Sequence, residues 1–294
     1  MTGGERTSVA GISDDRADAS SHNAPWHFGA KVAQIVIAAA LVLAVGTFPA
    51  AAQQFTDSSS ANKNPAQELQ IPAGTVLPAR LGRGISSRNA RSGQVITARI
   101  MQDVPLANRG KIREGTKIKG KIVSASANGT QRARIVFRFD VIESHHEEIP
   151  IVASLRAMAS FMEVLFAETP ETTPGFGDPY VWSVTHQIGG DVKYGVGGPV
   201  TDQFNNTVGK GTFDGVLVHV RAQAGTNCRG ALDQDQLQAL WVFSSDACGV
   251  YGMDGVRIVH AGRTDPVGEI ILAAESRELN LPAGTAMLLR VTAR

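Results

Sequence analysis

The chain has 294 residues, of which 43% are hydrophobic and 19% charged, and its formal net charge at neutral pH is +1. This length allows one large or two small domains with a sizeable core. It contains only two cysteines, Cys228 and Cys248, which are too few for a cysteine-based metal site without other ligands close by. In an oxidising compartment we expect these two cysteines to form a disulfide.

The N-terminal region carries the pattern of an exported protein. Residues 1–31 are polar and lack apolar periodicity, so we expect them to be disordered. Residues 32–52 contain an apolar run that follows Lys31 and ends in three alanines, which is typical of a secretory signal cleaved after Ala52. The run from residue 32 to 48 is also just long enough for an uncleaved membrane anchor, and both interpretations remain open. Either one places the folded part in the periplasm or cell envelope.

After a flexible leader at residues 53–70, the folded part begins and ends with related sequences. The segment Glu68–Leu81 matches Glu278–Val291 at seven of fourteen positions, and a looser third copy lies at Ile112–Thr116. In each long copy a Pro-Ala-Gly-Thr turn precedes a strand pattern. We expect Pro to occupy the second position of a type I turn, and the Gly that follows it accepts left-handed backbone geometry. If the first and last strands pair, the sheet closes and exposes no long edge.

Between the copies, alternation of polar and apolar residues predicts antiparallel strands with one buried and one wet face. From Arg80 to Arg138 there are fourteen Lys or Arg residues but only two acidic residues, whereas the segment from Asp140 to Asp178 is mainly acidic. The wet face is therefore a candidate surface for an anionic ligand. Its residues are Lys111, Arg113, Lys117, Lys119, Lys121, Arg132, Arg134 and Arg138. The alternative is a solvated strand face that the acidic segment neutralises.

The predicted fold is all-β: an antiparallel barrel or sandwich of about a dozen strands, with one short helix and a lobe clipped by the disulfide. The helix is expected at Arg156–Ala167, where Leu, Met and Phe recur at helical spacing, and we expect its Met-rich face to belong to the core. A Pro- and Gly-rich loop after residue 168 divides a first β half, 71–168, from a second, 169–294, that closes on the first.

Chemical signatures are weak. The cluster His145-His146-Glu147-Glu148 contains metal-ligating residue types, but neighbours in a strand or turn point apart, so we interpret it as a solvated hairpin tip. None of the glycine clusters has dinucleotide or phosphate-loop spacing, and no nucleophile elbow is found. We therefore assign no catalytic residue, cofactor or metal, and we favour a protein that is not an enzyme.

Part of the chain resembles a known family. Residues 71–79, 93–98 and 112–120 carry a Pro-x-Gly-Thr strand, a Gly-Gln-Val strand and a second Gly-Thr turn in order. Over residues 71–123 this arrangement resembles the TrbI family, whose members are barrel-forming subunits of conjugative type IV secretion channels. The resemblance implies a periplasmic β-barrel that oligomerises in the envelope.

Two functions follow as expectations. The first is a non-catalytic structural or assembly component of the cell envelope, acting as a homo-oligomer or within an envelope protein complex. The second is a binding module that holds an anionic polysaccharide or lipid headgroups on the cationic face. Nucleic acid is a weaker candidate, because aromatic residues for base stacking are sparse there.

Overall fold

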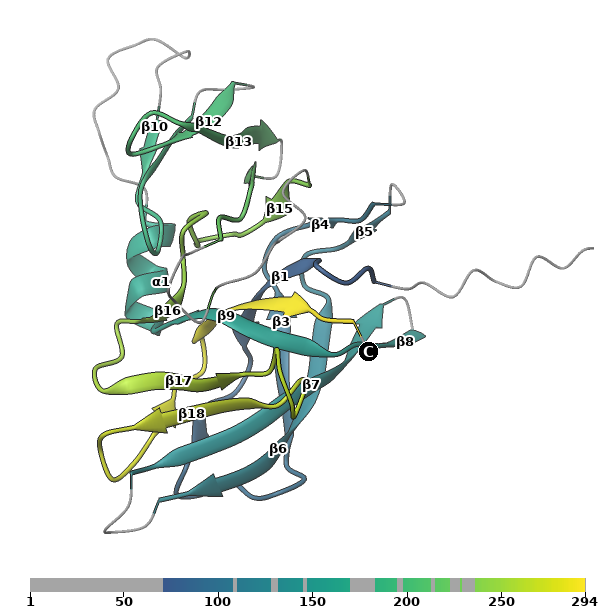
Figure 1. The fold of residues 1–294 in the computed structure, drawn as a ribbon, viewed down its shortest axis with the longest axis vertical. Helices are drawn as coiled ribbons and strands as arrows, with labels where there is room; N and C mark the ends of the chain where they lie inside the picture. The colour runs from purple at the N-terminus through teal and green to yellow at the C-terminus, as the bar shows by residue number, and fades with distance from the viewer. Residues whose placement is uncertain are drawn as a thin grey trace, which may run out of the picture. The chain divides into compact units, whose positions relative to one another are not determined.

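The computed structural model describes residues 71–107, 110–127, 132–144, 147–169, 183–194, 198–212, 215–222, 228 and 236–293. These residues are mostly β-strand with one short helix, which confirms the all-β class (Figure 1). A ten-stranded sheet has the order β16-β9-β20-β1-β3-β6-β7-β18-β17, with β8 beside β7. Its strands are β1 (Val76–Leu81), β3 (Val95–Ile100), β6 (Lys117–Ser126), β7 (Arg134–Ser144), β8 (Glu147–Pro150), β9 (Ala153–Ala159), β16 (Gly249–Tyr251), β17 (Val256–Ala261), β18 (Ile270–Ala274) and β20 (Ala286–Val291).

A second, smaller sheet and two short ribbons complete the described structure. The smaller sheet has the strand order β10-β11-β12-β13-β14-β15. Its strands are β10 (Ser183–Thr185), β11 (Val192–Tyr194), β12 (Pro199–Asp202), β13 (Thr207–Thr212), β14 (Gly215–Val218) and β15 (Gln238–Ala239). The ribbons pair β2 (Ile85–Ser86) with β19 (Asn280–Leu281), and β4 (Val104–Pro105) with β5 (Lys111–Ile112). The region after residue 168 therefore contributes to both sheets.

The predicted pairing of the terminal strands is confirmed. Strand β1 runs antiparallel to β20, with Pro78 opposite Leu288 at the centre of the pairing. The two copies of the repeat are related about this central pair: Gly74 N donates to Val291 O at 2.8 Å, and the equivalent Gly284 N donates to Leu81 O at 2.9 Å. The repeated sequence thus forms a local, approximately two-fold symmetric unit.

The repeat turns share one geometry. Thr75 N donates to Pro72 O, and Gly74 between them has φ = 93°, as the third position of a type II turn requires. Proline therefore occupies the first turn position and not the second. The turns at residues 91–94, 113–116 and 282–285 repeat this hydrogen bond and its left-handed glycine. Each one directly precedes a strand of the large sheet.

The large sheet is open, so a closed barrel is not confirmed. The terminal strands lie in its middle, and its edges are β16 and β17, between which no strand ladder forms in the described residues. These two edges are consecutive in the chain and are joined by residues 252–255 alone. Near the start of β9, Ala153 O lies only 3.4 Å from the position of a Cβ on Gly262, just beyond β17. The sheet therefore curls until its two ends approach each other.

Two hydrophobic cores share three strands. The first core lies within the curled sheet and includes Leu77, Phe137 and Leu289. The second lies between the other face of β9, β20 and β1 and the smaller sheet, and it includes Leu288 and Phe243. Strand β9 is consequently buried at every residue, whereas β6 is buried only at alternate residues over most of its length.

This burial explains an error in the predicted helix. Residues Arg156 to Ala159 belong to strand β9, and helix α1 spans Phe161–Glu168. A strand that is buried on both faces is apolar without alternation, and its sequence is easily taken for part of a helix. The N-cap of this helix is Ser160, whose side chain accepts a hydrogen bond from Glu163 N at 3.3 Å.

The close approach of β6 to β7 gives a first test of the register. A Cβ on Gly120 would lie 1.9 Å from the backbone oxygen of Arg138. We expect Gly120→Ala to lower the free energy of unfolding by about 3 kcal/mol or more, because backbone must move. Urea denaturation measures this loss. As the control, Gly115→Ala meets open space at φ = 80° and should cost only about 1 kcal/mol, so equal losses would contradict the register.

Candidate functional site

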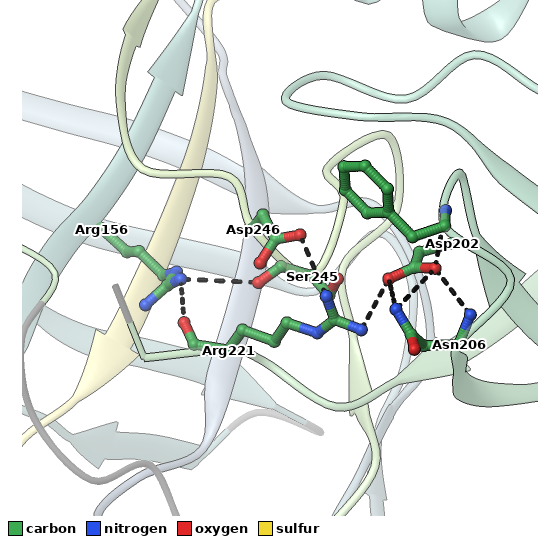
Figure 2. Close-up of polar contacts among 7 residues, drawn as sticks. Arg156, Asp202, Asn206, Arg221, Ser245 and Asp246 are labelled. Carbon is green, nitrogen blue, oxygen red and sulfur yellow. Dashed lines mark hydrogen bonds and ion pairs between the residues drawn. The ribbon is translucent and has the colours of Figure 1, made fainter. Parts of the chain in front are cut away.

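The most unusual polar group in the described structure is Arg156, on the doubly buried strand β9. The ladder with β20 pairs Leu288 with Ala157 and then Leu289 with Leu155, so Arg156 is the extra residue of a β-bulge. Bulges redirect side chains. Here the side chain leaves the ladder and reaches the loops around residues 221 and 245–247 (Figure 2).

The guanidinium group of Arg156 binds backbone oxygens. Its Nε donates to Ala247 O at 2.9 Å, and its Nη2 donates to Arg221 O at 2.5 Å and more weakly to Ser245 O at 3.5 Å. Only 7% of the residue is exposed. Burial lowers the pKa of Arg156 to about 10, against the opposing effect of Asp246, so the group is still charged at neutral pH.

A second arginine continues the network (Figure 2). Arg221 Nη2 lies 2.7 Å from Asp202 Oδ2, and its Nη1 lies 3.6 Å from Asp246 Oδ2. Asp202 also accepts hydrogen bonds from Phe204 N and Asn206 N at 3.0 and 2.8 Å. Burial would raise the pKa of Asp202, but the hydrogen bonds from Asn206, Arg221 and Phe204 outweigh it and hold that pKa below its usual range.

The disulfide joins the same junction. Cys228 and Cys248 are bonded, as predicted from the sequence, and Cys228 Sγ lies 3.4 Å from Arg156 O. A disulfide indicates an oxidising, exported environment. Within the described ranges, no helix is both long and apolar enough to cross a membrane.

We interpret this network, Arg156 with Arg221, Asp202, Asp246 and the disulfide, as a structural clamp. Each charged group in it already contacts a carbonyl, an amide or an opposite charge. A cavity of about 240 Å³ lies beside it. Its lining combines polar and apolar residues of β9, β16 and β17: Leu155, Arg156, Gly249, Val250, Val256, Arg257, Ile258 and Ala261. The sequence reasoning missed this clamp, although one signal was visible: a single charged residue inside the otherwise uncharged segment 153–159.

The predicted cationic face is only partly free. Lys117 Nζ lies 3.1 Å from Glu143, and Lys119 Nζ contacts Glu143 and lies 3.1 Å from Glu148. Hydrogen bonds from Lys119 and Lys117 lower the pKa of Glu143. Lys111 pairs with Asp103, and Arg138 Nε lies 2.9 Å from Asp140. Half of the candidate face is thus neutralised, mostly by strands β7 and β8.

The other four candidates remain exposed or half-buried without such partners. No ion pair joins Arg113, Lys121, Arg132 or Arg134 to another residue that the structure describes. Of the predicted hairpin tip, His145 and His146 lie outside the described residues. Elsewhere in the described chain no three metal-ligating side chains come together.

Helix α1 presents an apolar surface to solvent. Four large side chains, Phe161, Met162, Leu165 and Phe166, are 45%, 52%, 44% and 60% exposed. We call these four residues the α1 surface. The helix buries Val164 instead, so the prediction of a Met-rich core face is wrong for Met162 and Leu165.

A hollow of about 440 Å³ lies beside the α1 surface. It is lined by Ser160, Phe161, Met162, Glu163, Gly252, Pro282 and Ala283. The turn of the second repeat copy therefore forms one of its walls. Its apolar lining can accept an apolar side chain.

Comparisons of the sequence with protein-family models and with curated proteins find no match.

The clamp can be tested by removing its arginine. Arg156→Met keeps a long apolar side chain but leaves buried carbonyls without donors, so we expect a loss of roughly 3 kcal/mol in the free energy of unfolding. Chemical denaturation followed by tryptophan fluorescence measures it. The control is Arg99→Met, which removes one exposed hydrogen bond to Gly115 O and should cost about 1 kcal/mol or less. A loss no larger than that of the control would refute the clamp.

The lowered pKa of Asp202 leads us to expect that the stability of the protein depends on pH. Its folded pKa lies below the unfolded value of about 3.9, so its contribution is complete above that value and is lost as the pH falls through the folded pKa. The range from about pH 5 to 7 lies roughly one unit or more above the unfolded pKa. Over this range the difference in unfolding free energy between wild type and Asp202→Asn should therefore be constant, and it should shrink in more acidic buffer. A difference that grows on acidification would show the opposite sign. Asp254→Asn, at an exposed position, serves as the control.

Proposed function

We propose that the protein is a non-catalytic structural or assembly component of the cell envelope. The signal-like segment at residues 32–52 and the disulfide support export. The resemblance of residues 71–123 to TrbI channel subunits supports the periplasm as the compartment. It also supports oligomerisation, with the curled sheet as the wall of each subunit.

The α1 surface is the observation that carries this proposal. Contiguous exposed apolar side chains mark contact surfaces, because leaving them in water is costly. The surface is also held in place: Arg80 lies 3.8 Å from Glu168 at the end of the helix and 5.6 Å from the ring centre of Trp241. A fixed apolar helix beside an apolar hollow suits a protein partner.

We infer that the partner is a neighbouring copy of this chain. Such a contact joins the α1 surface to a different patch on the next copy, and a repeated contact of this kind generates rings when the rotation closes. This is the assembly that the resemblance to channel subunits implies. The hollow beside Phe161 would receive an apolar side chain from that copy.

Mutation of the α1 surface tests the assembly. We expect the exported chain to sediment as a multiple of the protomer in mild detergent, and Leu165→Glu with Phe166→Glu to sediment as the protomer, because burying carboxylates in an interface is costly. The control is Phe204→Glu with Val267→Glu, which adds the same charges at apolar positions that are 71% and 44% exposed outside α1. A monomeric wild type, or assembly that survives the α1 mutations, would contradict the proposal.

A second function, the binding of an anionic polymer, is favoured by one observation. Arg113, Lys121, Arg132 and Arg134 keep their charge without ion-pair partners among the described residues. Positively charged side chains at the surface attract polyanions over roughly 8 Å at physiological ionic strength. These four residues lie outside helix α1, so both functions can coexist.

A further inference from the structure

The hollow beside the α1 surface combines an apolar lining with one carboxylate. Its apolar walls come from Phe161, Met162, Pro282 and Ala283. Glu163 lies among them, and no ion pair joins it to another residue that the structure describes. Ser160 and Glu163 have the spacing of a capping box, but Ser160 N already donates to Tyr251 O at 3.0 Å. The hollow therefore suits an apolar side chain that has a positive charge beside it.

A patch with these two properties lies on the large sheet, at the start of β3. Val95 is 67% exposed, more than any other Val, Leu or Ile in the described residues. In the pairing of β3 with β6 it lies opposite Lys121, so the two side chains share a face. This is the outer face, because the adjacent residues Ile96 and Ile122 belong to the inner core. We call Val95 and Lys121 the Val95 patch.

Lys121 is available for a direct ion pair. None joins it to another residue in the described part of the chain, although two acidic residues lie near it by register. Asp140 Oδ1 lies 2.9 Å from Nε of Arg138, the cation opposite Lys121. Glu269 borders Arg138 on its other side, two strand spacings or about 10 Å from Lys121. Like charges that face each other across a ladder are unfavourable, so a further carboxylate beside Lys121 is stabilising.

The hollow and the Val95 patch lie toward the same end of the sheet but on different strands. Gly284 N donates to Leu81 O, which ties the turn beside α1 to the end of β1. Leu81 lies opposite Ala98, and Val95 is three residues further along β3, about 10 Å away. Helix α1 follows β9, and β20 and β1 separate β9 from β3, so on a curled sheet the two sites face different directions. Copies that stand side by side can therefore join one site to the other, and repetition of such a contact generates a ring.

We propose that Val95 of one copy enters the hollow beside Phe161 of the next copy, where Lys121 pairs with Glu163. The inference rests on the proposed assembly of this chain, and it names the patch that meets the α1 surface. Side chains that lie directly opposite in a ladder have Cβ atoms about 5 Å apart, so the Lys121 ammonium reaches the edge of the site that Val95 fills. The charge pair selects this patch and its orientation. Of the four cations suited to polymer binding, the contact engages Lys121 alone.

An exchange of the two charges tests the pair. Lys121→Glu and Glu163→Lys should each raise the protein concentration at the midpoint of assembly by about tenfold or more, because like charges then meet. Both changes in one chain restore an opposite pair and should bring the midpoint back to within about threefold of wild type. Sedimentation of a dilution series in mild detergent measures the midpoints. As the control, Arg113→Glu adds the same charge near the other end of β3 and should not restore assembly of Glu163→Lys.

Engineered cysteines test the geometry without a change of charge. A mixture of Val95→Cys chains and Met162→Cys chains should form disulfide-linked dimers under mild oxidation, whereas neither variant alone should do so, because the contact joins two different patches. The control mixture pairs Met162→Cys with Arg113→Cys, and it should stay unlinked. Non-reducing electrophoresis separates the products.

The outcomes distinguish this contact from the assembly itself. If the wild type assembles but the exchanged charges do not restore assembly, or the control mixture links as readily as the Val95 mixture, the Val95 contact is wrong and the α1 surface meets another patch. A monomeric wild type would overturn the assembly and this contact together. Should a charge variant unfold in denaturation measurements, the cysteine mixtures decide, since they keep both charges.

Discussion

Three adjacent strands, β9, β20 and β1, are buried on both faces, and both hydrophobic cores are built on them. Because side chains alternate along a strand, a slip of one residue would exchange the residues of the two cores. The repeat turns prevent such a slip. Gly74 bonds the end of β20, and Gly284 bonds the end of β1, so each turn fixes where the other strand ends. The duplicated sequence therefore sets the register on which both layers depend.

The same double burial explains Arg156. In a strand with apolar surroundings on both sides, a charged side chain has no solvent to reach. The bulge moves Arg156 out of the alternation and directs it to carbonyls of the smaller layer. Carbonyl acceptors near the disulfide thus replace water, and the two layers are tied at one point by hydrogen bonds and a covalent link. A junction fixed in this way gives α1, which follows β9 directly, a defined position.

The sequence predicted features that depend on local patterns and missed those that depend on layers. Alternation in Lys117–Ile122 and the repeated turns indicated the strands, because a half-buried strand shows its two faces in its residues. Strand β9 carried no such pattern, so part of it was taken as helix. Of the predicted cationic residues, Lys117 and Lys119 proved to be paired, since that depends on the register of β6 with β7. Arg156 was not assigned to a polar network at all, because only the fold brings the carbonyls of Arg221 and Ala247 to its guanidinium group.

Whether a Lys or Arg side chain of the large sheet has an acidic partner depends on the strand beside it. Where β6 meets β7 and the β7–β8 hairpin, acidic residues of that hairpin lie beside the lysines, and the charges cancel. Where β7 meets β18, the neighbouring strand is Ile270–Ala274, which is buried along its whole length and carries no charge. Acidic residues border this strand only at its ends, where Glu275 N donates to Gly255 O at 3.0 Å. Glu275 therefore lies on the same face as Arg134 and Arg257, two residues along from Ala273, which is opposite both arginines.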